Sequence, residues 1–484
     1  MNKIRVRVLS CVILLMSVAA LAAPVASTPP DLAGIWQGVL KIGGIELRLV
    51  IKVSKTEREQ YTATLDSPDQ GAKDIPASLV SFTNGDVKIE IKVISGVFTG
   101  KMSDDNTITG EWKQGSAALP LIMKRTDKAP EAPRRPQEPQ KPFPYKDEEV
   151  RYDNPKAGIK LAGTLTIPTA GGPFPAAILI SGSGPQDRDE ALLGHKPFLV
   201  LADYLTRQGI AVLRFDDRGV GKSTGEFAKA TSADFATDVL AGVEYLQTRQ
   251  EINPKQIGLI GHSEGGLIAP MVAAQSPAVA FIVLMAGPGI SGEEILYLQS
   301  TLIARASGAP ETAIAKNLAL SKKTFAVIKA EPDNAVAERK LHPIWTQALN
   351  ALTDEEKKAL DFTGGSPDSL FQTQIKQLLS PWFRYFLFYD PQLALQKVKC
   401  PVLALNGEKD LQVPPKENLT AIAQALKAGG NKKFITKELA NLNHLFQTAT
   451  TGAPIEYNKI EETISPHALQ TLGDWILAQT QPQR

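Results

Sequence analysis

Six prolines fall between residues 130 and 144 of this chain, and they separate two stretches with different patterns. They occupy positions 130, 133, 136, 139, 142 and 144, among Glu, Arg, Gln and Lys. Proline at that density cannot form a helix interior or a central strand. We therefore expect an extended, semi-rigid linker over residues 126–144. It would join an N-terminal domain at 31–125 to a C-terminal domain at 145–484, and a chain of 484 residues is long enough for both.

Alternating apolar and polar residues predict β-strands in the N-terminal domain. Apolar side chains take every second position at 45–53 and again at 87–93, which is typical of strands with one buried face. Turn signals such as Gly43-Gly44 and Asn84-Gly85 lie between these stretches. With about eight short strands of this kind, the pattern predicts a small antiparallel all-β barrel or sandwich.

The pattern changes from about residue 145. Short apolar runs such as Ala176–Ile180 and Val279–Met285 now alternate with amphipathic helical stretches such as Asp234–Arg249. Parallel strands that are buried on both faces have this apolar character, so the fold class is α/β, with a mostly parallel sheet between helices. The alternation pauses over about 291–390, where the composition is helical and no strand is clear. We expect a helical insertion there.

Residues 1–22 are typical of a secretory signal peptide. Lys3, Arg5 and Arg7 precede an apolar run from Val8 to Ala22, which ends in a small-x-small cleavage pattern. The run has about 15 residues, too few to span a membrane comfortably. The expectation is an exported protein, periplasmic or secreted, with no stable membrane span after signal cleavage. The alternative is an uncleaved N-terminal anchor.

Charge and cysteine content disfavour several function classes. Lys and Arg number 53 against 51 Asp and Glu, so no broad basic surface for nucleic acid is implied. Cys11 lies in the signal and Cys400 is alone, which leaves no disulfide and no cysteine metal site. Gly219–Ser223 ends like a phosphate-binding loop, but position 216 is Asp where that motif needs Gly. We expect no cofactor and no metal.

A G-x-S-x-G string supplies a candidate nucleophile. Gly261-His262-Ser263-Glu264-Gly265 follows the apolar strand 257–260 and opens a helix over 265–274. This is the context of a nucleophile elbow, in which the serine hydroxyl stands above the sheet edge at a helix N-terminus. The alternative is a glycine-rich turn with an incidental serine.

A serine nucleophile needs a base and an acid that orients it, and in this fold the chain order is Ser, acid, His. Asp410 follows the strand 401–405, and His444 follows the strand 434–437. Both would emerge at the carboxyl edge of the sheet, as Ser263 does. The rivals of Asp410 are Glu408 and the acids near residue 390. The other histidines, at 195, 262, 342 and 467, lack this order or strand-end position.

Two backbone N–H groups are expected to form an oxyanion hole. One belongs to Glu264, the residue after the nucleophile, and the other to the loop after the strand 176–180. That loop reads Ser181-Gly182-Ser183-Gly184-Pro185, where glycines allow close approach of a substrate, and we favour the Ser183 N–H. A simple glycine turn is the alternative.

Four motifs in order resemble one known family: 182–189 (GSGPQDRD), 215–219 (FDDRG), 261–266 (GHSEGG) and 443–447 (NHLFQ). Together they are similar to bacterial α/β-hydrolase esterases of the EstD type, which are related to the serine aminopeptidase and dienelactone hydrolase branches. The likeness covers roughly residues 145–480. It implies an α/β-hydrolase fold in which Ser263, Asp410 and His444 form a triad, and it implies nothing about the N-terminal β domain.

The predicted function is that of a serine carboxylesterase, which hydrolyses a small-molecule ester through an acyl-enzyme. The insertion at about 291–390 would form a lid over the acyl pocket. The alternatives are a serine peptidase of the aminopeptidase type, a thioesterase, and a non-catalytic binding protein that has kept the scaffold. A propeller-type peptidase is disfavoured, because about 95 residues are too few for a propeller. Oligomeric state and acyl specificity stay open.

Overall fold

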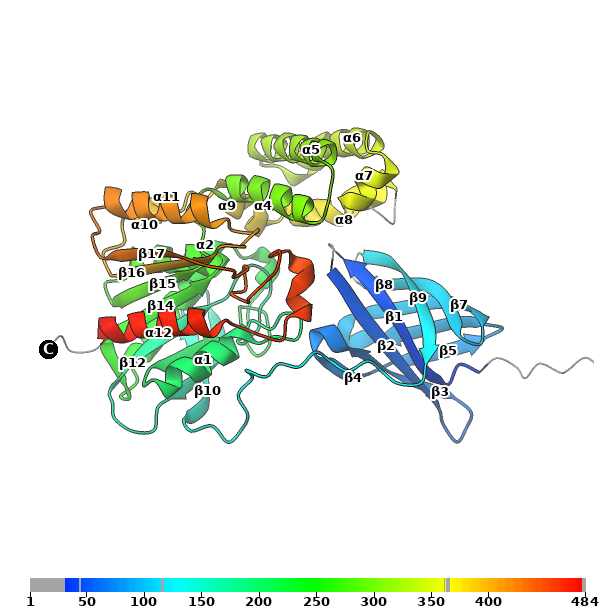
Figure 1. Cartoon of the computed structure of the whole chain (residues 1–484), viewed down its shortest axis with the longest axis horizontal. Helices are drawn as coiled ribbons and strands as arrows, with labels where there is room; N and C mark the ends of the chain where they lie inside the picture. Colours follow the sequence, from blue (N-terminus) through cyan, green and yellow to red (C-terminus); the bar gives the residue numbers. More distant parts are fainter. Residues whose placement is uncertain (1–30, 43–44, 115–116, 361, 363–365, 481–484) are drawn as a thin grey trace, which may run out of the picture.

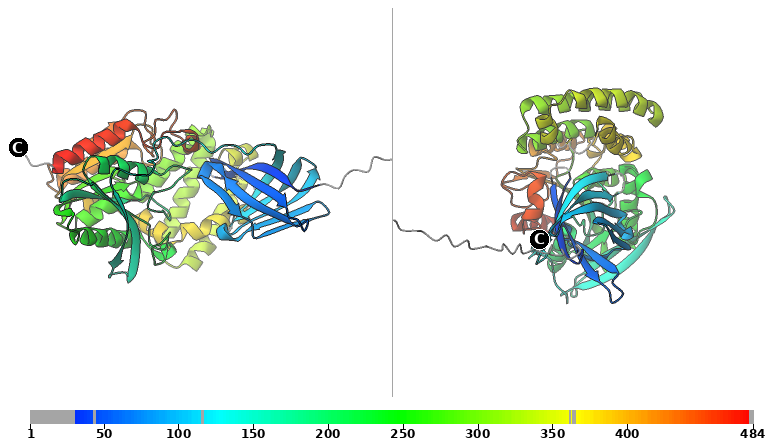
Figure 2. Two further views of the ribbon diagram at one scale, coloured as in Figure 1. Left: turned by 90° about the horizontal axis from the view of Figure 1, so that it is seen from below. Right: turned by 90° about the vertical axis from the view of Figure 1, so that its right-hand side faces the viewer.

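The computed structural model describes residues 31–42, 45–114, 117–360, 362 and 366–480. The predicted signal peptide lies outside them. The described chain forms two sheets and a group of helices (Figure 1). The smaller sheet lies beside the larger one along the long axis of the molecule, and the helical group lies across one side (Figures 1 and 2). No helix among the described residues is long and apolar enough to cross a membrane.

The N-terminal strands form one antiparallel sheet rather than two stacked sheets. Its order is β4-β3-β2-β1-β9-β8-β7-β6-β5, and β3 lies close to β5, so the sheet curls into a half-barrel (Figure 1). The all-β prediction is confirmed, with nine strands in the described residues instead of about eight. The strands are β1 (Gly34–Ile42), β2 (Ile45–Lys55), β3 (Tyr61–Ser67), β4 (Ala72–Pro76), β5 (Leu79–Thr83), β6 (Asp86–Ile91), β7 (Gly96–Asp104), β8 (Thr107–Gln114) and β9 (Ala117–Thr126), with short 3₁₀ turns η1 (Pro68–Gln70) and η2 (Lys92–Ile94).

Side chains from the inner face of the half-barrel fill its interior. Trp36, Phe98 and Trp112 are at most 2% exposed, among aliphatic residues from every second position of the strands. The Trp36 indole N–H donates to the Leu32 carbonyl at 2.8 Å, so its polar atom is satisfied inside the apolar core. Burial of one face per strand explains the period-two pattern of the sequence.

Residues 127–145, between β9 and β10, contain no helix or strand, as the prolines predict. They are not a free spacer, however. The Arg135 guanidinium donates to the carbonyls of Leu193, Asn458 and Ile460, and Gln137 accepts from the Thr463 N–H at 2.6 Å. The segment is thus bound along the surface of the C-terminal domain, so it does not act as an extended spacer between the two domains.

The C-terminal sheet has eight strands in the order β10-β11-β13-β12-β14-β15-β16-β17. β10, β11 and β13 pair antiparallel, and all later pairs are parallel. The strands are β10 (Lys146–Asn154), β11 (Ile159–Ile167), β12 (Phe174–Ile180), β13 (Ala211–Phe215), β14 (Ile252–His262), β15 (Val279–Met285), β16 (Val402–Gly407) and β17 (Phe434–Leu439).

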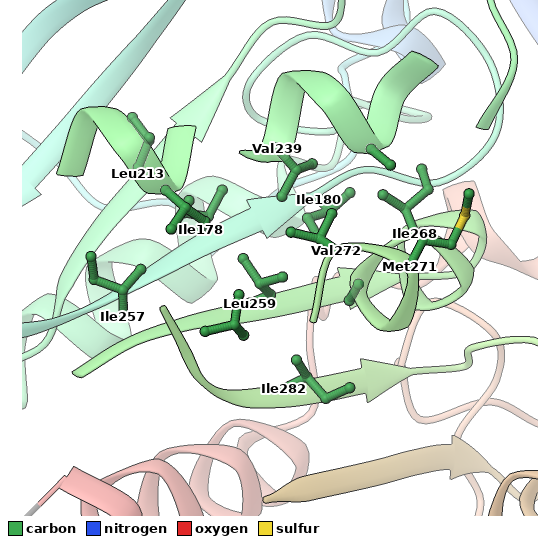
Figure 3. Close-up of a cluster of buried hydrophobic side chains, with 14 of the residues drawn as sticks. Ile178, Ile180, Leu213, Val239, Ile257, Leu259, Ile268, Met271, Val272 and Ile282 are labelled. Atoms are coloured by element: carbon green, nitrogen blue, oxygen red, sulfur yellow. The ribbon is translucent and has the colours of Figure 1, made fainter. Parts of the chain in front are cut away.

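Helices cover both faces of this sheet and enclose an apolar core on each. Figure 3 shows one of them, where side chains of β12, β14 and β15 pack against α2 and α3. Because both faces of the central strands are buried, those strands are almost wholly apolar, as the sequence indicates. One face carries α2 (Ser232–Gln247), α3 (Glu264–Ala273), α10 (Gln392–Leu395) and α11 (Pro415–Ala428), and the other carries α1 (Pro197–Arg207) and α12 (Pro466–Thr480).

Between β15 and β16 the chain leaves the sheet and forms the helical insertion. The insertion has its own core, in which Trp345, Phe371 and Phe383 are at most 7% exposed. Ser291, Asp333, Thr353, Ser366 and Ser380 accept backbone N–H groups at helix starts, which fixes where those helices begin. Its helices are α4 (Gly292–Ala306), α5 (Glu311–Ala330), α6 (Asn334–Asn350), α7 (Asp354–Ala359), α8 (Pro367–Leu378) and α9 (Pro381–Phe388).

Candidate active site

Ser263 stands on a sharp turn between β14 and α3. Its backbone has φ 52° and ψ −118°, a conformation that residues other than glycine rarely adopt. The flanking glycines are required by space: a Cβ at Gly261 would lie 2.0 Å from the Gly265 carbonyl oxygen, and a Cβ at Gly265 would lie 2.1 Å from the Ile180 oxygen. The G-x-S-x-G string therefore encodes the strained elbow that lifts the serine above the sheet.

Asp410 and His444 form a buried acid–imidazole pair. His444 Nδ1 lies 2.8 Å from Asp410 Oδ2, and the two side chains are 5% and 0% exposed. The other carboxylate oxygen accepts the N–H groups of Gln412 and Val413 at 2.8 and 2.9 Å. With Nδ1 directed at a carboxylate, the imidazole carries its proton there and keeps Nε2 as its basic atom.

Ser263 and His444 line one cavity of about 310 Å³, so the structure brings together the three residues that the chain order predicts. Within the described chain, no hydrogen bond joins the Ser263 hydroxyl to the imidazole. Such contacts are often long without substrate and shorten in the reacting complex.

The backbone N–H groups of Ser183 and Glu264, both at this cavity, have no acceptor among the described residues. The neighbouring Gly182 N–H is engaged, since it donates to Glu190 Oε1 at 2.6 Å, and the Ser263 N–H donates to the Met285 carbonyl. The two N–H groups predicted for the oxyanion hole are therefore free to donate to a bound substrate.

The cavity is lined by apolar side chains and by glutamines. Helices α4 and α9 of the insertion contribute Ile295, Leu296, Trp382, Phe383 and Phe386. The glutamines in its lining are Gln186, Gln299, Gln377 and Gln412.

Known proteins are similar to parts of this chain. Residues 196–363 match the family model of serine aminopeptidases, S33, a span that includes Ser263 but neither Asp410 nor His444. Esterase EstD of Thermotoga maritima is 26% identical over 326 residues, or 66% of this chain. The C-terminal domain has the α/β-hydrolase fold. This chain is homologous to EstD, and the match spans 65% of EstD, just under two thirds of its length.

Other proteins are similar over parts of the chain. The uncharacterised protein YfhR of Escherichia coli is 32% identical over 127 residues, which is 26% of this chain and 41% of YfhR. Among solved structures, the Pyrococcus furiosus esterase PF2001 superposes with a TM-score of 0.40 and 18% identity, covering 70% of this chain and 91% of that one. The α/β hydrolase GrgF of Penicillium gives 0.42 and 17%, covering 70% and 99%.

A second histidine–acid pair lies beside the first in the hydrolase domain. His262 Nδ1 is 2.9 Å from Glu190 Oε1, and His262 Nε2 is 3.0 Å from the carbonyl oxygen of His444. Both ring nitrogens thus face acceptors, which only an imidazolium can satisfy with two N–H groups. Burial alone would lower the pKa of His262, but the Glu190 carboxylate outweighs burial and the net effect raises it.

The Glu264 side chain links the elbow to the helical insertion. Its buried carboxyl accepts from Ser232 Oγ at 2.6 Å, where α2 begins, and from the Trp382 indole N–H of α9 at 2.8 Å. Burial raises the pKa of Glu264, against the lowering effect of these donors. The residue whose N–H is predicted to face the oxyanion therefore also contacts α9.

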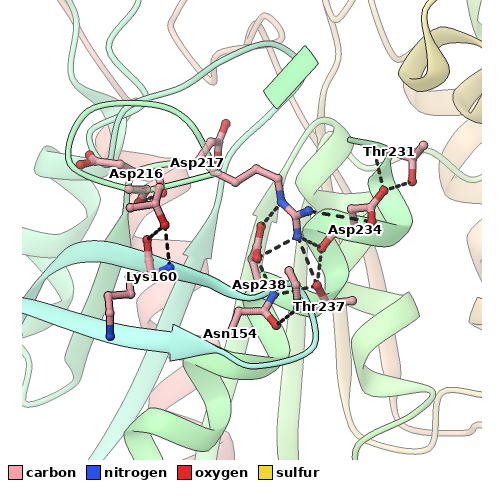
Figure 4. A network of polar contacts seen from close by, with 12 residues as sticks. Asn154, Lys160, Asp216, Asp217, Thr231, Asp234, Thr237 and Asp238 are labelled. Carbon is pink, nitrogen blue, oxygen red and sulfur yellow. Dashed lines mark hydrogen bonds and ion pairs between the residues drawn. The ribbon is translucent and has the colours of Figure 1, made fainter. Parts of the chain in front are cut away.

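The loop after β13 contacts other elements through its charged residues. Asp216 pairs with Arg188, while Arg218 pairs with Asp238 of α2 at 2.7 Å, within the network of Figure 4. Asp217 accepts from Ser181 Oγ and the Gln186 N–H, and burial raises its pKa to about 7. The GSGPQDRD and FDDRG motifs thus hold each other and fix the loop that carries Ser183.

The remaining candidates have other roles. His195 is buried against Thr463 and the Tyr457 carbonyl, while His342 lies on α6 beside Asp368. Glu408 accepts the Asn441 N–H on the surface. Sequence reasoning missed Glu190 and Trp382, since neither is placed at a recognisable offset from Ser263. No group of three metal-ligating side chains occurs in the described chain.

Proposed function

We propose that this chain is a serine carboxylesterase, with Ser263 as nucleophile, His444 as general base and Asp410 as the acid that orients it. The observation that carries the proposal is the Asp410–His444 pair at 2.8 Å, on the same cavity as the elbow serine. The esterase EstD similarity supports the reaction type. The predicted signal peptide supports action outside the cytoplasm.

The geometry supports the following reaction steps. His444 Nε2 accepts the Ser263 proton as the hydroxyl oxygen attacks the ester carbonyl carbon. Asp410 stabilises the imidazolium that results, and its position is fixed by the N–H groups of Gln412 and Val413. The N–H groups of Ser183 and Glu264 donate to the oxyanion. His444 then protonates the leaving alcohol, and water hydrolyses the acyl-enzyme by the same steps.

The cavity lining favours a neutral ester with an apolar group. Its only carboxylates among the described lining residues, Glu190 and Glu264, are already engaged by Gly182, His262, Ser232 and Trp382. A free α-ammonium of a peptide substrate would need an unengaged carboxylate. The insertion supplies the apolar wall, so we assign it the role of a lid that sets acyl specificity.

The test is covalent labelling with a fluorophosphonate probe, followed by a substrate panel. Wild type is expected to be labelled and to hydrolyse p-nitrophenyl esters faster than aminoacyl anilides. The Ser263→Ala variant should be unlabelled, at an unfolding midpoint close to that of wild type. Faster anilide turnover would favour the peptidase alternative, and an unlabelled wild type would favour a binding protein.

A further inference from the structure

Three side chains of the hydrolase domain are part of the half-barrel's apolar core. Leu193, Leu445 and Tyr457 are 8%, 6% and 2% exposed, and they cluster with the inward-facing residues of β1 and β2. The 3₁₀ turn η4 (Pro454–Lys459), which carries Tyr457, lies against β2. In Figure 1 this orange-red turn stands at the end of the half-barrel that faces the hydrolase domain. The core of one domain is therefore completed by the other.

Two of these side chains lie next to the catalytic groups proposed above. Leu445 follows His444 directly and also lines the active-site cavity. The Tyr457 hydroxyl accepts from Gln412 Nε2 at 3.1 Å, and the Gln412 backbone N–H donates to Asp410. The half-barrel thus contacts the loop of the base directly and the loop of the acid through one hydrogen bond.

Polar contacts also occur where the half-barrel meets the hydrolase domain. Asn458 Nδ2 donates to the Glu46 carbonyl of β2 at 3.3 Å. Arg135 of the proline-rich segment donates to three carbonyls of the hydrolase domain beside this contact, at Leu193, Asn458 and Ile460. The positions of 193, 445 and 457 are therefore set jointly by the two domains.

We propose that the half-barrel is a positioning domain for the catalytic histidine. Leu445 and Tyr457 pack into its core, and this packing fixes the positions of His444 and Asp410 relative to Ser263. Residues 440–453 have no helix or strand of their own, so their conformation depends on what they pack against. The interior of the half-barrel is filled by its own side chains together with Leu193, Leu445 and Tyr457, which favours this role over ligand binding inside it. The inference rests on the proposed esterase function.

The test compares two substitutions on the same strand and the same sheet face. Leu47 lies at the end of β2 that contacts η4, and Val53 lies six residues further along, about 20 Å away at strand spacing. Both side chains belong to the half-barrel core, so Leu47→Ala and Val53→Ala should each lower the unfolding midpoint. In the full-length chain, kcat, KM and the rate of fluorophosphonate labelling at Ser263 are measured for each variant.

Leu47→Ala is expected to slow labelling and lower kcat at least fivefold with KM nearly unchanged, while Val53→Ala stays within twofold of wild type. Leu47→Met should restore most of the rate. Equal rates in the two alanine variants, slowed or not, would overturn the inference. If Leu47→Ala does not fold, Leu47→Val against Val53→Ala gives the same comparison. A wild type that is not labelled would instead refute the esterase proposal.

Discussion

The half-barrel and the hydrolase domain differ in how deeply their ion pairs are buried. In the half-barrel most ion pairs lie on the outer surface, such as Lys113–Glu111, whose side chains are 56% and 42% exposed. The hydrolase domain also has exposed pairs, but some of its pairs are buried on both sides, such as Arg218–Asp238 at 9% and 2%. Surface pairs contribute little to stability, whereas removing one partner of a buried pair is costly.

This difference in burial distinguishes the ionisable groups near the candidate active site from those elsewhere on the surface. Buried ionisable groups of the hydrolase domain gather at the loop after β12, where Glu190, Asp217 and Glu264 surround Ser181–Ser183. A core made only of apolar side chains would be simpler to stabilise. Burial of so many ionisable groups in one place is a sign of function, because such groups orient neighbours and shift pKa values.

The largest effect is expected from Asp410→Asn. Asparagine can still accept from the Gln412 and Val413 N–H groups, but its amide nitrogen would face His444 Nδ1 and stabilise the wrong tautomer. We expect kcat to fall by about 10³–10⁴-fold with an intact fold. Steady-state kinetics and the unfolding midpoint check this. A fall below tenfold would exclude Asp410 as the orienting acid.

The next effect is expected from Glu190→Gln, which removes the charge opposite His262. His262 can then no longer hold two protons in a buried site, and its bond to the His444 carbonyl weakens. Activity should fall about tenfold or more, and stability near pH 6 by about 3 kcal/mol. Because the pKa of His262 is raised in the folded chain, its contribution is complete below the unfolded value near 6.5 and is lost as pH rises through the folded value.

Urea unfolding at pH 6 and pH 9 measures this stability difference, which should shrink at the higher pH. The matched control is Glu149→Gln, an acid on the neighbouring β10 whose side chain is 62% exposed. A pH-independent loss would mean that Glu190 acts only through the Gly182 N–H.

The sequence predicted correctly those features that a single short segment of the chain encodes. The elbow was predictable because five consecutive residues encode it, and the positions of Asp410 and His444 were predictable because each follows a predicted strand. The half-barrel was predictable only as all-β: strand alternation reports a buried face, but closure into one curled sheet depends on which edges meet. The strands of the hydrolase domain were visible as apolar runs because both of their faces are buried.

The supporting contacts of the site were not predictable, for a physical reason. Glu190 and His262 are 72 residues apart, and Glu264 and Trp382 are 118 apart. No local spacing rule connects such pairs, since their meeting depends on how loops and the insertion pack. The FDDRG loop shows the same limit, because its charges pair with Arg188 and Asp238 instead of one another.

A smaller, pH-dependent effect is expected at His195, which lies between the proline-rich segment and η4. Burial lowers its pKa to about 4. The unfolded chain takes up this proton below about pH 6.5, so stability is lost as pH falls from 6.5 to 4, by about 3 kcal/mol at most. His195→Gln should flatten this part of the curve. Urea titrations of both proteins at pH 4.5 and 7 give the comparison, and parallel curves would contradict it.

The smallest effect is expected from Glu111→Gln on the outer face of the half-barrel. Glu111 and Lys113 are two residues apart on β8, both largely in solvent, so their attraction is screened by water and salt. The substitution should leave the unfolding midpoint and kcat within error of wild type at 0.15 M salt. A clear loss of stability at that salt concentration would show that charge on the half-barrel surface matters. Burial would then not explain why ion pairs of the two domains differ in their contribution to stability.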